Sequence, residues 1–128
     1  MANSNPKYGY VSARYVHTDG VTVATQTLAT TSNVPEGAVI TSTTVIARGA
    51  IDSGADNATI TIIAGGVTTT SAIAEAKLLD AGYVVREDVV EEASAVSDGT
   101  AIKVAIGTSV LTGSSADLDI IVEYVFIG

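Results

Sequence analysis

The chain has 128 residues, a net charge of −8 and no cysteine. Its length fits one domain that buries a core without disulfides or zinc–thiolate sites. The acidic surface disfavours nucleic acids and anionic membranes as partners. Hydrophobic residues make up 47% but aromatic residues only 5%, so the core must consist of Val, Ile, Leu and Ala, which suits sheets packed face to face.

The first seven residues, MANSNPK, are polar and contain no apolar run of the kind found in signal peptides or membrane helices. We therefore expect a protein that is made in a cytoplasm. Residues 1–7 are predicted to form an extended arm, which is either disordered or laid on a neighbouring subunit. Residues 8–128 are predicted to form the single folded domain.

The first predicted strand covers residues 8–17. Tyr8, Tyr10 and Arg14 lie on one face, and Val11, Ala13 and Tyr15 lie on the other. Tyrosine and arginine are enriched in protein interfaces, so this is either an interface strand or an ordinary edge strand. The Asp19-Gly20 turn signal that follows allows a hairpin between residues 10–17 and 21–29.

The middle of the chain predicts further short elements. Residues 38–47 and 58–63 are rich in β-branched residues, and each run follows a stretch of turn residues. Residues 71–82, SAIAEAKLLDAG, consist of good helix formers with a glycine at the end, which predicts one short helix. Residues 83–92 predict a surface strand that leads into an acidic loop.

Two runs of strict alternation end the chain. Ile102, Val104 and Ile106 form the apolar face of the first run, and residues 118–126 alternate in the same way. The turn residues between the runs favour antiparallel neighbours in one sheet. Apart from Glu123, residues 121–127 are apolar on both faces, so we expect a cover on both sides, one of them a neighbouring subunit.

Seven or eight short strands with regular turn signals are typical of an all-β fold. The sequence therefore predicts an antiparallel β-sandwich or jelly roll with one short helix.

Candidate chemical groups are few. His17 is the only histidine, and no nucleophile elbow accompanies it. Residues 52–57, DSGADN, offer oxygen ligands for a cation but lack EF-hand spacing, and they also suit an ordinary turn. The acidic pairs at 87–88 and 91–92 fit a solvated edge better than a catalytic pair. We predict no catalytic residue, no cofactor and no metal site.

From Val34 onward the sequence resembles a group of small tailed-phage virion proteins. The resembling segments are PEGAVI at residues 35–40, IAEAKLLDAG at 73–82, and a closing strand with Thr112-Gly113 followed by LDIIVEY at 118–124. Residues 114–117 widen the step before the closing strand, and the first 30 residues are not covered.

The resemblance implies a virion structural protein with a β-sandwich fold, and in particular a capsid decoration (cement) protein. Such a protein binds the outer surface of a shell of major capsid protein, commonly as a homotrimer. A receptor- or glycan-binding module of a virion is the alternative. The residues predicted to form interfaces are Asn5, Lys7, Tyr8, Tyr10, Arg14, Tyr15, Ile121, Val125 and Ile127.

Overall fold

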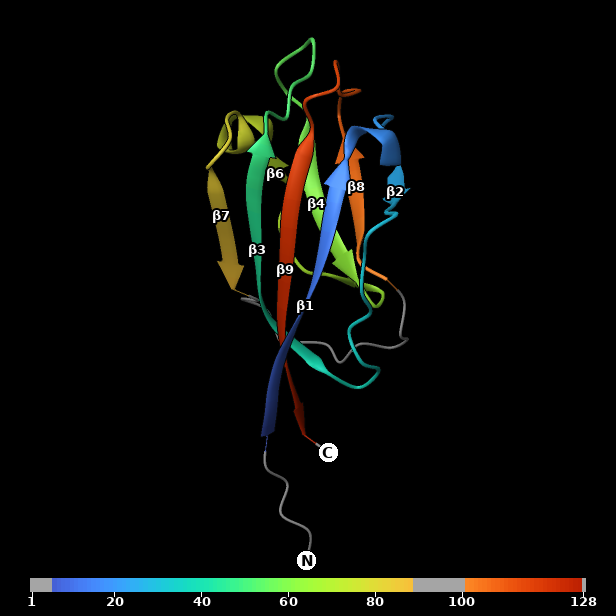
Figure 1. The fold of residues 1–128 in the computed structure, drawn as a ribbon, viewed down its shortest axis with the longest axis vertical. Coiled ribbons are helices and arrows are strands. Elements are labelled where there is room, and N and C mark those ends of the chain that lie inside the picture. Colours follow the sequence, from blue (N-terminus) through green and yellow to red (C-terminus); the bar gives the residue numbers. More distant parts are fainter. Residues whose placement is uncertain (1–5, 89–100, 128) are drawn as a thin grey trace, which may run out of the picture.

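A computed structural model describes residues 6–88 and 101–127. Two antiparallel sheets account for most of these residues, and Figure 1 shows them as two stacked layers. The strands are β1 (Pro6–Val16), β2 (Thr25–Thr27), β3 (Val39–Gly49), β4 (Thr59–Ala64), β5 (Val67–Thr68), β6 (Ile73–Ala74), β7 (Val84–Asp88), β8 (Lys103–Gly107) and β9 (Asp117–Ile127). Two 3-10 helices, η1 (His17–Asp19) and η2 (Glu75–Leu78), complete the described elements.

The first sheet has the strand order β1-β9-β3-β7, and we call it the β1–β9 sheet. The second has the order β2-β8-β4-β5, with β6 also paired to β4. Every connection except those joining β4, β5 and β6 crosses from one sheet to the other. The long strand β9 lies between β1 and β3, and its ladder with β1 pairs Pro6 with Ile127 and Val16 with Asp117.

The core lies between the two sheets and contains small aliphatic side chains. Alternate residues of β4, β8 and β9 point inward, so Ile60, Val104 and Ile120 are buried while their neighbours are partly exposed. This is the pattern expected when strands have one buried face. The predicted β-sandwich is therefore confirmed.

Both predicted strand pairings are wrong. Residues 10–17 and 21–29 do not form a hairpin, because β1 pairs with β9 while β2 pairs with β8 in the other sheet. The two closing runs also separate, with β8 and β9 facing each other from opposite sheets. The Asp19 side chain helps to make the first crossing, since its carboxylate accepts hydrogen bonds from the Val16 N–H (2.9 Å) and the Ala29 N–H (3.0 Å).

The predicted helix at residues 71–82 is also wrong. The segment forms β6, which adds to β4, and then the single turn of η2. Tertiary contacts override helix propensity here, because Ile73, Glu75 and Leu78 are all buried and fix the direction of the backbone. No helix in the described ranges is long and apolar enough to cross a membrane.

A candidate interface on the β1–β9 face

The outer surface of the β1–β9 sheet carries most of the predicted interface residues, and we call it the β1–β9 face. Even-numbered residues of β1 and odd-numbered residues of β9 point to it, because side chains alternate along a strand. Tyr8 is 80% exposed and Tyr10 is 69% exposed. Ile121 and Val125 of β9 are half-buried beside them. The face therefore presents two large aromatic side chains over a partly apolar floor.

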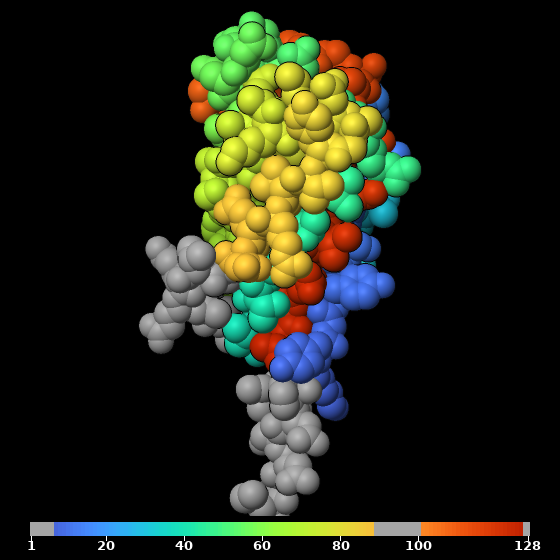
Figure 2. Space-filling view, turned by 90° about the vertical axis from the view of Figure 1, so that its left-hand side faces the viewer, coloured from blue at the N-terminus to red at the C-terminus, as the bar shows by residue number. Residues whose placement is uncertain are grey.

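The floor is hollowed between the two tyrosines. Tyr8, Gly9, Tyr10, Ile121 and Glu123 line this shallow hollow. A glycine is needed at position 9 because the Tyr124 ring lies against its backbone on the other side of the strand, the side turned away from the hollow. A Cβ added at Gly9 would lie 2.6 Å from the Tyr124 hydroxyl oxygen, so a larger residue would displace the ring. Figure 2 shows the start of β1, in blue, standing out from the body beside the end of β9, in red.

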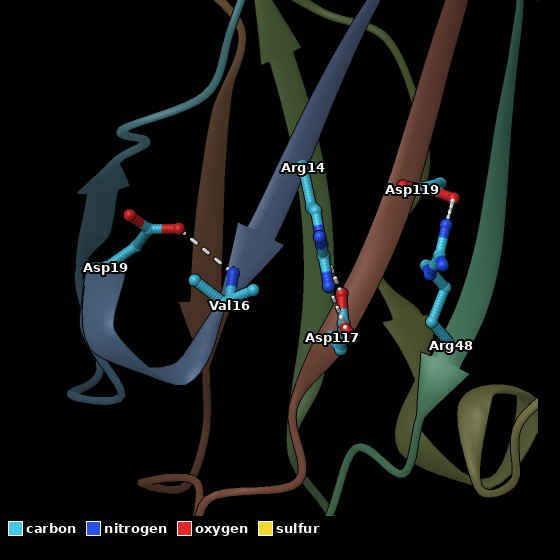
Figure 3. A network of polar contacts seen from close by, with 6 residues as sticks. All are labelled: Arg14, Val16, Asp19, Arg48, Asp117 and Asp119. Atoms are coloured by element: carbon cyan, nitrogen blue, oxygen red, sulfur yellow. Dashed lines mark hydrogen bonds and ion pairs between the residues drawn. The ribbon is translucent and has the colours of Figure 1, made fainter.

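Three arginines pair with the acids of this face, as Figure 3 shows for two of them. Arg14 of β1 contacts Asp117 of β9 with two parallel hydrogen bonds, Nε to Oδ1 at 2.9 Å and Nη2 to Oδ2 at 2.7 Å. On the other side of β9, Arg48 of β3 binds Asp119 at 2.9 Å. The third arginine, Arg86 of β7, lies 3.5 Å from Glu123 and 3.4 Å from Asp88.

These pairs nearly neutralise the face. Its four carboxylates meet three guanidinium groups, so it carries only one unit of the chain's net charge of −8. The Arg14 hydrogen bonds lower the pKa of Asp117, and Asp117 in turn raises the pKa of Arg14. An otherwise acidic molecule thus has one face on which repulsion between copies, or from an acidic partner, is weak.

The Arg14–Asp117 pair gives a testable pH dependence. A carboxyl group whose folded pKa lies below its unfolded value of about 4 stabilises the fold above that pH, and this contribution disappears as the pH falls through the folded pKa. We expect Arg14→Gln to raise the pKa of Asp117 and to flatten the loss of stability below about pH 4. Carboxyl NMR titration measures the first effect and acid-denaturation curves measure the second. Lys77→Gln, which removes a charge from an exposed position on η2, is the control. An unchanged Asp117 pKa in Arg14→Gln would contradict this account.

Tyr15 needs a correction. It is fully buried, because odd-numbered residues of β1 face the core, and its hydroxyl donates a hydrogen bond to the Gly20 carbonyl at 2.6 Å. Burial, together with the nearby Asp19 carboxylate, raises the pKa of Tyr15 to about 12. Tyr15 is thus a core residue of the β1–η1 corner and not a surface that a partner can reach.

The other predicted interface residues are placed as follows. Lys7 and Arg14 are exposed, and the side chains of Ile121 and Val125 reach the β1–β9 face. Ile127 is the last residue of β9 and pairs with Pro6. Asn5 lies outside the described residues, as do Glu91 and Glu92 of the acidic loop. The role of these residues as an interface stays a prediction.

The 52–57 loop, which offers oxygen ligands but was predicted to hold no metal, lies at the opposite end of the sandwich. Asp52 and Asp56 bring their carboxylates within 4.8 Å of a third one, that of Glu75. Glu75 is buried, and its carboxylate accepts hydrogen bonds from the Ser53 N–H (3.1 Å), the Ala58 N–H (2.8 Å) and the Ser53 hydroxyl. These bonds clamp the 52–58 loop to η2, a structural role that requires no ion. Sequence reasoning missed Glu75, because it stood among helix formers and gave no sign of pointing inward.

The remaining chemical candidates are scattered. His17 is half-buried at the start of η1. Glu87 binds the Ser71 N–H (3.0 Å) and the Ser71 hydroxyl (2.9 Å), while Asp88 contacts Arg86 on the other face of β7. The structure does not bring these groups together.

No protein-family model matches the sequence, and no curated protein matches it. The fold is similar to that of a chain in the cyanophage Pam1 capsid asymmetric unit. That match has a TM-score of 0.61 and 19% sequence identity, and it covers 95% of this chain and 85% of that one. A chain from the acidic stable capsid structure of the Helicobacter pylori bacteriophage KHP30 is also similar. Its TM-score is 0.58 and its identity 12%, covering 95% of this chain and 92% of that one. At these identities the likeness is one of fold.

Proposed function

We propose that the protein is a phage capsid decoration (cement) protein, which binds the outer surface of a shell of major capsid protein as a homotrimer and stabilises it. The observation that carries this proposal is the likeness to chains from two phage capsid structures over 95% of the chain. Both matches also cover most of the other chain, so the whole sandwich is shared and not only one hairpin.

The strand order supports the same proposal. Sheets ordered β1-β9-β3-β7 and β2-β8-β4-β5 are what an eight-stranded jelly roll produces when the chain wraps between its two sheets. In that reading β6 is a short addition beside β4. We infer that the sandwich is of the jelly-roll type, which recurs in viral capsid proteins and in lectins.

The β1–β9 face supports a binding role over a catalytic one. Its exposed tyrosines, its paired arginines and its partly apolar floor are the composition typical of protein interfaces. A cement protein acts by mass action: it binds the assembled shell and not the distorted one, so the shell loses binding free energy when it deforms. Such a protein needs a rigid body, for which the two-sheet sandwich is suited, and a contact surface, for which the β1–β9 face is the candidate.

Shells of the parent virus that lack the protein provide the test. Adding purified protein should decorate these shells and raise their melting temperature. A free concentration of 100 times the dissociation constant stabilises each site by about 2.7 kcal/mol. Calorimetry and electron microscopy measure the two effects, and sedimentation equilibrium of the free protein should give a mass that is a multiple of three protomers. Shells that stay bare and melt unchanged would contradict the cement proposal, whereas a mass that is not a multiple of three would contradict only the trimer.

The hollow between Tyr8 and Tyr10 favours a second candidate function. Tyrosine rings that flank a carboxylate, here Glu123, are the kind of surface that binds a sugar ring, and lectins use the same fold class. The protein would then be a glycan- or receptor-binding module of a virion. Binding on a glycan array that Tyr8→Ser abolishes and Tyr83→Ser preserves would favour this function over cement.

A further inference from the structure

The outer edge of β1 differs from the other sheet edges. β1 has 11 residues and pairs with β9 on one side only, whereas β2, β5 and β7 have between two and five described residues. Proteins keep exposed edge strands short, charged or covered, because open N–H and C=O groups recruit further strands. A long, tyrosine-rich edge strand is therefore expected to pair with another strand.

The direction of the free backbone groups follows from two hydrogen bonds. The Arg14 N–H donates to the Thr30 carbonyl at 2.9 Å and the Val16 N–H donates to the Asp19 carboxylate, so even-numbered residues of β1 point their backbone away from β9. These two contacts close the upper half of the edge. In the lower half, Tyr8, Tyr10 and Ser12 direct their N–H and C=O groups outward, where no described residue pairs with them.

The open half matches a second copy of itself. If two β1 strands meet antiparallel with Tyr10 opposite Tyr10 of the other copy, Tyr8 lies opposite Ser12, and all three outward-facing residues of each strand are paired. In the same register Pro6, which has no N–H, falls opposite Arg14, whose N–H is already used by Thr30. The ladder therefore ends at the position where neither strand has a free donor.

The side chains suit the same register. Lys7 is the only charged residue between Pro6 and Ala13, and it falls opposite Ala13, so no like charges meet. Tyr10 would pair with its own counterpart across the two-fold axis, an aromatic cross-strand pair of the favourable kind. The arginine pairs on the adjoining face keep the local charge close to zero, so repulsion between two chains of net charge −8 is weaker there than elsewhere on the molecule.

We propose that the open edge of β1 binds β1 of a second copy of this chain, antiparallel and centred on Tyr10. The two β1–β9 sheets then become one continuous sheet of eight strands across a two-fold axis. The contact joins copies in pairs, so it yields a dimer from monomers and a hexamer if the protein also forms trimers. This inference does not rest on the cement proposal, since the edge of β1 is open whatever the function of the protein.

Sedimentation equilibrium over a range of concentrations tests the pairing. The wild-type protein should contain an even number of protomers. Tyr10→Lys places two ammonium groups opposite each other at the axis, and should raise the dissociation constant of the pair at least about tenfold. Tyr83→Lys adds the same charge at another exposed tyrosine and should leave the mass unchanged. Tyr10→Pro removes the Tyr10 N–H donor at the centre of the pair but spares the ladder with β9. This variant should have half the oligomer mass of the wild-type protein.

Amide hydrogen exchange of the wild-type protein is a second test of the pairing, and it does not depend on whether the variants fold. In the paired wild-type protein the amides of Tyr8, Tyr10 and Ser12 should be protected, and dilution below the dissociation constant should release them. Monomers or odd-numbered oligomers in the wild type, or fast exchange of these three amides in an even-numbered one, would overturn the proposal. Shell decoration is measured separately, so failure here is distinguishable from failure of the proposed function.

Discussion

Glu75→Ala is expected to lower the free energy of unfolding by about 3–5 kcal/mol. Glu75 is 3% exposed, and its carboxylate is the acceptor for two backbone N–H groups and one hydroxyl. Truncation leaves the Ser53 and Ala58 N–H groups buried without an acceptor and opens a void beneath η2. An unpaired buried donor costs the full penalty of its desolvation, which exceeds the net gain of an ordinary hydrogen bond.

Urea denaturation followed by circular dichroism measures this effect. Glu36→Ala removes a carboxylate from an exposed turn and should change the stability by less than about 0.5 kcal/mol. Glu75→Gln keeps one carbonyl oxygen as an acceptor, so its cost should fall between those of the other two variants. A Glu75→Ala protein as stable as Glu36→Ala would show that the 52–58 loop is not held by this carboxylate.

Ile120→Ala is expected to cost about 3–4 kcal/mol. Ile120 is fully buried at the centre of β9, opposite Ala13 of β1 and Val45 of β3. The strand is held by ladders on both sides, so it cannot move to fill the space left by the side chain, and the cost of the cavity adds to the loss of buried apolar area.

Ile121→Ala is the matched control, since it removes the same atoms one residue further along the same strand. Ile121 points to the β1–β9 face and is half-buried, so its truncation should cost less than about 1.5 kcal/mol. Thermal or chemical denaturation compares the two variants directly. Equal costs would mean that the β1–β9 face is covered in the free protein as fully as the core.

The sequence predicted the faces of the strands better than their partners. Alternation along residues 118–126 identified Leu118, Ile120 and Val122 as core residues, and all three are buried. Alternation also separated Tyr15 from Tyr8 and Tyr10, so its burial could have been recognised. Alternation does not reveal which strands are neighbours. The apolar faces of β8 and β9 are buried equally well whether the two strands pair in one sheet or face each other across the core of a sandwich.

The pairing errors explain what was missed at the candidate site. Arg14 and Asp117 are 103 residues apart, and only the β1–β9 ladder brings them together. The balanced charge of the β1–β9 face was therefore invisible until the strand order was known. Glu75 was missed for a similar reason, since its partners at Ser53 and Ala58 lie across a loop that residue patterns describe only as a turn.

The position of β9 constrains how the chain can fold during synthesis. β9 is made after every other described strand, yet it lies between β1 and β3. A nascent chain on the ribosome therefore carries β1 without a partner in its sheet until residues 117–127 emerge. Closing a loop of more than 100 residues is slow compared with forming local hairpins. Until β9 leaves the ribosome, β1 therefore has both of its edges open, and its risk of aberrant association is greatest in that interval.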